Sequence, residues 1–143
     1  MLREELRQRL VKEYRYAVTK MQQESQLAKK LFYFSVLFGE AQRTLNWEWD
    51  TDIILIYTIT QHAYTQLNAT MQTPALLTTL PVDWTTVFDN LTKVASDLAN
   101  YLENAKNTSN KDELFQILGR FSEISYAISG NGSYLYGKGV FTF

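Results

Sequence analysis

The chain has no cysteine, only one histidine and only two prolines among 143 residues. The lack of cysteine excludes disulfides and thiolate metal sites, so neither a secreted disulfide scaffold nor a zinc ribbon is supported. The longest apolar runs, 31–34 and 53–57, fall far short of the roughly 18 residues that a membrane-spanning helix needs. Charged residues close to Met1 interrupt the apolar stretch of a signal peptide. We therefore expect a cytoplasmic protein without a membrane span.

The composition is that of a globular protein, with 45% hydrophobic and 20% charged residues. We expect one domain over residues 1–130 and a separate tail over 131–143. Residues 1–46 carry nine Lys or Arg against five Asp or Glu, whereas residues 47–143 carry five against ten. This asymmetry favours basic helices that lie against acidic ones, within a monomer or across a dimer. The alternative is a basic face for nucleic acid.

Apolar residues recur at intervals of three and four over 2–21 and again over 27–45, which predicts two amphipathic helices. We place a break near Ser25, with one long bent helix as the alternative. The stretch 31–38 is apolar nearly all round, so the second helix is expected to be the most buried. Gly39 in its middle is unfavourable by about 1 kcal/mol relative to Ala, which predicts a crossing helix or a kink there.

The segment from 51 to about 69 combines two signals. Residues 53–59 are β-branched enough for a strand, but helical spacing continues beyond the length of a typical strand, so a helix is favoured. Asp50 or Thr51 is expected to cap this helix at its N-terminus. The two prolines bound a short helix near 74–80.

The clearest pattern lies in 84–105, where apolar residues follow a heptad-like spacing behind a predicted cap at Asp83. A final helix is expected over 110–128, with a capping box at Ser109 or Asn110. The short connections favour antiparallel neighbours. The sequence therefore predicts an all-α fold, an antiparallel bundle of four long helices plus the short helix near 74–80.

The C-terminal tail, residues 131–143, departs from helical spacing. Its aromatic residues flank a glycine turn and are candidates for an interaction surface: Tyr134, Tyr136, Phe141 and Phe143. The pattern is compatible with a small β-hairpin. Two isolated strands are marginally stable in water, so we expect this tail to dock on the bundle or on another subunit.

The segment that joins the second and third helices concentrates two indoles, Trp47 and Trp49, with the carboxylates Asp50 and Asp52. Paired carboxylates suit acid–base chemistry or cation binding. The favoured interpretation is structural, in which the acidic residues cap a helix and the tryptophans close the end of the core. This turn is still the best candidate for a local recognition site.

No catalytic, metal or cofactor motif is found. His62 has no Glu three residues away on its helix, so a di-iron site is unsupported, and no phosphate-binding loop or triad is present.

In helix count alone the chain resembles the HEPN class of helical nucleases and their inactive relatives. Those enzymes carry an Arg a few residues before a His, whereas here the nearest upstream Arg is Arg43. No site residue is carried over, and no cofactor is expected.

Three functions remain open. The favoured hypothesis is a non-enzymatic interaction or assembly protein, a homo-oligomer or one with a protein partner. The second is a nucleic-acid-associated protein, such as a coat protein or an inactive HEPN-like protein, although a pI near 5.8 argues against it. Its contacts would come from the first helix: Arg7, Lys12, Arg15 and Lys20. The third is an enzyme with a pocket between helices, formed by Glu40, Asp50, Asp52 and His62.

Overall fold

The computed structural model describes residues 2–72, 83–105 and 111–128, and these residues form five α-helices without any strand. The helices are α1 (Glu4–Gln23), α2 (Leu27–Leu45), α3 (Thr51–Gln72), α5 (Trp84–Asn104) and α6 (Asp112–Ile128). The all-α prediction is confirmed, as is the choice of helix over strand for α3. The expected short helix near 74–80 and the tail over 131–143 lie outside the described residues.

The predicted total of four long helices is wrong. Five helices of 17 to 22 residues are present, one for each long segment with helical spacing, because the first two segments form separate helices. The predicted break near Ser25 is confirmed, and it separates α1 from α2. Glu24 and Gln26 have extended backbone, and the Glu24 carboxylate accepts hydrogen bonds from the amides of Ser25 and Gln26, each at 3.1 Å. This local bonding replaces helical hydrogen bonds and ends α1 without Gly or Pro.

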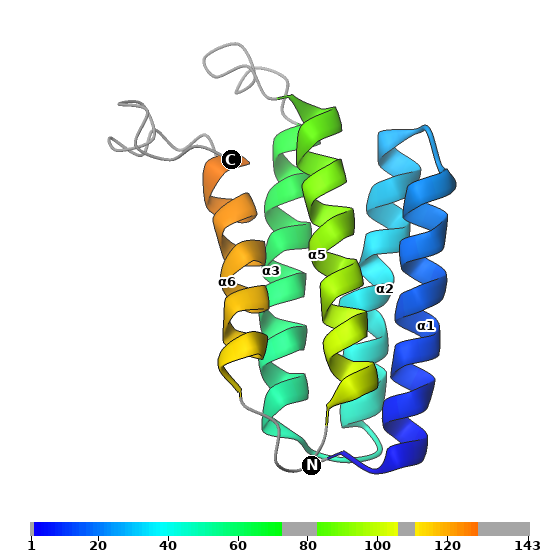
Figure 1. Ribbon diagram of the computed structural model, residues 1–143. Coiled ribbons are helices and arrows are strands. Elements are labelled where there is room, and N and C mark those ends of the chain that lie inside the picture. Colours follow the sequence, from blue (N-terminus) through cyan, green and yellow to red (C-terminus); the bar gives the residue numbers. More distant parts are fainter. Residues whose placement is uncertain (1, 73–82, 106–110, 129–143) are drawn as a thin grey trace.

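The five helices form a closed ring in the order α1, α2, α3, α6, α5, and α2 also touches α5 across the ring. Helices that follow one another along the chain run in opposite directions, as the short connections predicted (Figure 1). The neighbours α3 and α6 run in the same direction (Figure 1). α1 and α6 lie at opposite edges of the bundle in this view.

The core is built from the apolar stripes of all five helices. Its largest fully buried side chains include Tyr14, Phe34, Phe88 and Phe121. The rings of Phe34 and Phe121, from α2 and α6, lie 5.9 Å apart between centroids. Tyr14 donates a hydrogen bond of 2.5 Å to the carbonyl oxygen of Leu37, which satisfies its buried hydroxyl. The stripes predicted for α1, α3, α5 and α6 are therefore confirmed as core.

The prediction that the second helix is the most buried is wrong. α5 contributes ten buried residues, whereas α2 contributes five. The apolar stretch of α2 faces both inward and outward, and Phe32 on its outer side is 66% exposed. No helix of the described ring covers that side, so high hydropathy there does not produce burial.

The crossing helix expected at Gly39 is also absent from the described structure. α2 continues through Gly39, and a Cβ atom placed on this residue would meet nothing within 4 Å. Gly39 lies on the exposed side of α2, where the ring has no neighbour to approach it. Within the described residues, none of the helices is both long and apolar enough to cross a membrane.

Candidate functional site

The turn between α2 and α3 uses its acidic residues to hold helix ends together. Asp50 accepts a hydrogen bond of 3.1 Å from the amide of Ile53, so the predicted cap of α3 is confirmed. Asp52 pairs with Lys111 just before α6, and this hydrogen bond raises the pKa of Lys111. Glu48 accepts two hydrogen bonds from Arg3. Glu48 and Asp52 therefore connect segments that are distant in the sequence, whereas Asp50 acts locally on its own helix.

The two tryptophans of this turn do not close the core. Trp47 is 66% exposed and Trp49 is 77% exposed, so both indoles project into solvent. The structural interpretation of the tryptophans is wrong, because the core at this end is closed by residues such as Leu2, Ile53 and Leu102. Their role as interaction residues stays a prediction. The other predicted interaction residues, those of the tail, lie outside the described residues.

A small cavity of about 20 Å³ lies beside this turn, between Asp52, Tyr101 and Lys111. Tyr101 is 5% exposed, and its hydroxyl has no hydrogen-bond partner among the described residues. Burial raises the pKa of Tyr101, and the nearby Lys111 lowers it in part. This volume is close to that of one water molecule, so the cavity is too small for a substrate.

The residues of the predicted catalytic pocket are not brought together. His62 lies on the exposed side of α3, ten residues after Asp52, which corresponds to roughly 15 Å along a helix. Glu40 lies on α2 and pairs with Arg43 at 3.7 Å. The small cavity is lined by Asp50 and Asp52 but by neither Glu40 nor His62. Among the described residues, no group of three or more His, Asp and Glu side chains could hold a metal ion.

Two of the four predicted nucleic-acid contacts are engaged in holding α1 against α5. The guanidinium of Arg7 donates to the carbonyl oxygens of Leu102 and Glu103, the latter at 2.8 Å, and its side chain is 12% exposed. Arg15 pairs with the carboxylate of Glu103. These contacts support the favoured interpretation of the charge asymmetry, in which the basic N-terminal helix lies against an acidic later one.

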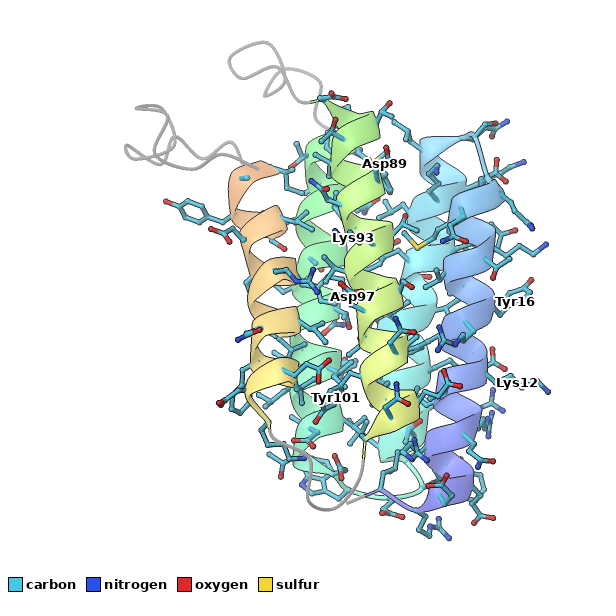
Figure 2. All side chains as sticks on the ribbon, viewed as in Figure 1. Lys12, Tyr16, Asp89, Lys93, Asp97 and Tyr101 are labelled. Atoms are coloured by element: carbon cyan, nitrogen blue, oxygen red, sulfur yellow. The ribbon has the colours of Figure 1, made fainter. Side chains whose placement is uncertain are left out.

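The other two predicted contacts remain at the surface. Lys12 is exposed and makes no ion pair with a described residue, and Figure 2 shows it projecting away from the bundle beside Tyr16. The ammonium of Lys20 lies 5.7 Å from the centre of the Tyr16 ring, within the range of a cation–π contact. Arg9 and Lys29 likewise have no ion-pair partner in the described part of the chain.

These cations surround three aromatic side chains on the outer side of α1 and α2. Tyr33 lies between the other two, with ring centroids 6.5 Å from Tyr16 and 5.6 Å from Phe32. Tyr16 is 53% exposed and Phe32 is 66% exposed. We call this surface the cationic aromatic face, and its members are Arg9, Lys12, Tyr16, Lys20, Lys29, Phe32 and Tyr33. Sequence reasoning offered Tyr16 as a ring on which a base could stack, but it missed Phe32 and Tyr33 because it assigned the apolar run of α2 to the core.

A polar groove of about 370 Å³ runs along α5, where Asp89, Lys93 and Asp97 follow one another at intervals of one helical turn (Figure 2). Gln22 and Lys30, from the α1–α2 hairpin, line its other side. Both charge signs are present, and Asp97 is engaged with Arg120 at 2.6 Å. The groove is open, and the buried polar residue that lines it, Thr92, already donates its hydroxyl to the carbonyl oxygen of Phe88 at 2.7 Å.

Comparisons of this chain with protein-family models, with curated proteins and with solved structures found no match.

Proposed function

We propose that this chain is a non-enzymatic interaction protein that assembles with itself, and that the cationic aromatic face is part of the interface. The observation that carries the proposal is the exposure of Phe32 and Tyr16 on either side of Tyr33. Single exposed aromatic residues are common, but a cluster of them on one face is typical of an interface centre. The candidate catalytic residues, by contrast, are separated or engaged in structural contacts.

Burial of the two exposed aromatic rings alone would not give a stable assembly. Burying the exposed parts of Phe32 and Tyr16, at about 100 Å² each, would contribute roughly 5 kcal/mol at 25 cal/mol per Å². Association opposes this with at least about 4 kcal/mol of lost translational and rotational freedom. The aromatic contact alone therefore gives weak binding. The cations around it, which make no ion pair within the described residues, supply the electrostatic complementarity that would select the partner.

The test is light scattering of the full chain over a range of concentrations, together with two variants. Phe32→Ser removes the most exposed side chain of the face, and Trp47→Ser is the matched control because Trp47 has the same exposed fraction, 66%, elsewhere on the surface. We expect the wild type and Trp47→Ser to form oligomers and Phe32→Ser to remain monomeric, with circular dichroism showing that all three fold. A wild type that is monomeric at every concentration would overturn the proposal. Loss of assembly only in Trp47→Ser would move the interface to the α2–α3 turn.

A nucleic-acid partner is the second candidate, and the exposed ring of Tyr16 between Lys12 and Lys20 supports it. Cations that follow a backbone and an aromatic ring on which a base can stack are the elements of single-strand binding. The net charge of −1 argues against a dedicated binder. Titration of a fluorescent single-stranded oligonucleotide at low and high salt separates the two candidates, because nucleic-acid binding weakens steeply with salt.

A further inference from the structure

The outer side of α6 carries a second surface whose charge is opposite to that of the cationic aromatic face. Phe115 is 53% exposed and Tyr126 is 42% exposed, and both lie on one stripe of the helix with Glu123. Glu113 is exposed at the margin of this stripe, and neither Glu113 nor Glu123 pairs with a cation of the described chain. We call this surface the acidic aromatic face, and its members are Asp112, Glu113, Phe115, Gly119, Glu123 and Tyr126.

Gly119 shapes the middle of this second face. It lies one turn from Phe115 and one turn from Glu123, and a Cβ atom placed on it would meet nothing within 4 Å. The stripe therefore has a gap between a ring and a carboxylate. An aromatic ring that protrudes from a partner, as Phe32 does from α2, can approach the α6 backbone at this gap.

The two faces belong to opposite edges of the ring of helices. Figure 1 places α1 at one edge and α6 at the other, and α6 packs on α3 and α5. One copy of the chain cannot bring its own two faces together, because the bundle lies between them. Two neighbouring copies can do so without any change in their folds.

Charge decides which faces can meet. A symmetric contact of the cationic aromatic face with itself would oppose Lys12 and Lys29 to the same lysines of the second copy. The same contact of the acidic aromatic face would oppose Glu113 and Glu123 to each other. Like charges at an interface disfavour association strongly, whereas unlike charges guide the encounter and fix the register. Only the contact between unlike faces places aromatic residues against aromatic residues and cations against carboxylates.

We infer that the acidic aromatic face of one copy docks on the cationic aromatic face of another. This inference rests on the proposed self-assembly and adds which surfaces meet. Because each copy carries both faces, a bound pair still presents one free face of each kind. Such a head-to-tail contact closes into a ring if the rotation between copies permits it, and otherwise grows into an open chain. The expected assembly is therefore larger than a dimer, increases in size with concentration and shortens at high salt.

The test reverses one charge on each face and compares it with a matched reversal elsewhere. Lys12→Glu alters the cationic aromatic face, and its control is Lys93→Glu on α5, since both lysines are exposed and have no ion-pair partner in the described chain. Glu123→Lys alters the acidic aromatic face, and its control is Asp89→Lys. Circular dichroism and thermal unfolding establish that each variant folds. Sedimentation velocity then measures self-association at low salt.

We expect Lys12→Glu and Glu123→Lys each to weaken self-association at least tenfold, and both controls to match the wild type. An equimolar mixture of Lys12→Glu and Glu123→Lys should restore assembly, with the two variants alternating along it. The carboxylate that the first substitution introduces meets the ammonium that the second introduces, and the unaltered faces of the two variants also remain complementary. The control mixture of Lys93→Glu and Asp89→Lys should gain nothing over either variant alone, which separates this rescue from general attraction between oppositely charged proteins.

The outcomes separate the two proposals. If the wild type assembles and Glu123→Lys assembles equally well, the α6 contact is wrong while self-assembly stands. If Lys12→Glu assembles like the wild type, the cationic aromatic face is not the docking surface and the inference fails. A wild type that remains monomeric refutes both proposals. If that monomer binds a single-stranded oligonucleotide and Lys12→Glu abolishes the binding, the partner of the face is nucleic acid.

Discussion

Replacement of Arg7 by Gln should destabilise the fold, although Arg7 lies among the cations that the sequence marks as nucleic-acid contacts. Its guanidinium donates to the carbonyl oxygens of Leu102 and Glu103, within the last four residues of α5, whose carbonyls lack partners inside the helix. A hydrogen bond from a charged donor contributes about 1.5–3 kcal/mol, and a cation at a helix C-terminus adds up to about 1 kcal/mol at an exposed site.

The contact with Leu102 is partly buried and the contact with Glu103 is exposed, so the lower end of that range applies. We expect Arg7→Gln to lower the free energy of unfolding by about 2 kcal/mol. For a chain of this size the melting temperature should fall by roughly 6 °C. Glu4, which also pairs with Arg7, is exposed and can be hydrated when its partner is removed.

The assay is urea denaturation followed by circular dichroism, with Lys12→Gln as the control. Lys12 lies on the same helix and the substitution removes the same charge, but its side chain is exposed and has no ion-pair partner in the described structure. Its free energy of unfolding should change by no more than about 0.5 kcal/mol. Equal effects of the two substitutions would refute the reasoning, because the loss would then reflect net charge and not the contact with α5.

Three further predictions concern stability. Gly39→Ala and Gly119→Ala should each raise the free energy of unfolding by about 1 kcal/mol, because both glycines lie within helices where a Cβ meets nothing within 4 Å. In the same denaturation assay, Tyr14→Phe should lower the free energy of unfolding by about 1 kcal/mol because it removes a buried hydrogen bond. Tyr101→Phe should be neutral or stabilising because its buried hydroxyl has no partner within the described part of the chain. The hydrogen bonds of the α5 cap hold the pKa of Asp83 below its usual range. The contribution of the ionised cap to the free energy of unfolding is therefore present at neutral pH, and it is lost as the pH falls through that lowered pKa. Asp83→Asn should remove this part of the acid sensitivity in melting curves recorded from neutral to acidic pH.

The helices themselves were predictable from sequence because their signals are local. A stripe of apolar residues at helical spacing needs only the chain segment that carries it. The caps at Asp50 and Asp83 depend on residues three positions away, and the structure confirms both, with an amide hydrogen bond to each carboxylate. The burial of Thr60 on the apolar stripe of α3 also depends on a local contact, because its hydroxyl donates a hydrogen bond of 2.6 Å to the carbonyl oxygen of Ile56, one turn earlier.

The predictions that failed depend on which helices become neighbours. The run 31–38 is apolar on two sides of α2, and periodicity does not tell which side a second helix will cover. Gly39 has no close neighbour for the same reason. A helix with one apolar stripe has a single side that can be buried. In a helix with two apolar sides, the arrangement of the neighbouring helices decides which side is buried.

The candidate site was hard to predict for the same reason, because it consists of groups that the packing of the described helices leaves at the surface. Arg7 and Lys12 are equivalent in the sequence, both being cations on the polar part of one amphipathic helix. The position of α5 beside α1 makes Arg7 a structural contact and leaves Lys12 at the surface. Phe32 and Phe34 are likewise two residues apart in one apolar run, yet one is 66% exposed and the other is fully buried. An interaction surface on a helical bundle therefore consists of the cations and aromatic rings that the packing of the helices leaves exposed. Which side chains these are depends on how the helices are arranged, and the pattern of a single helix does not show it.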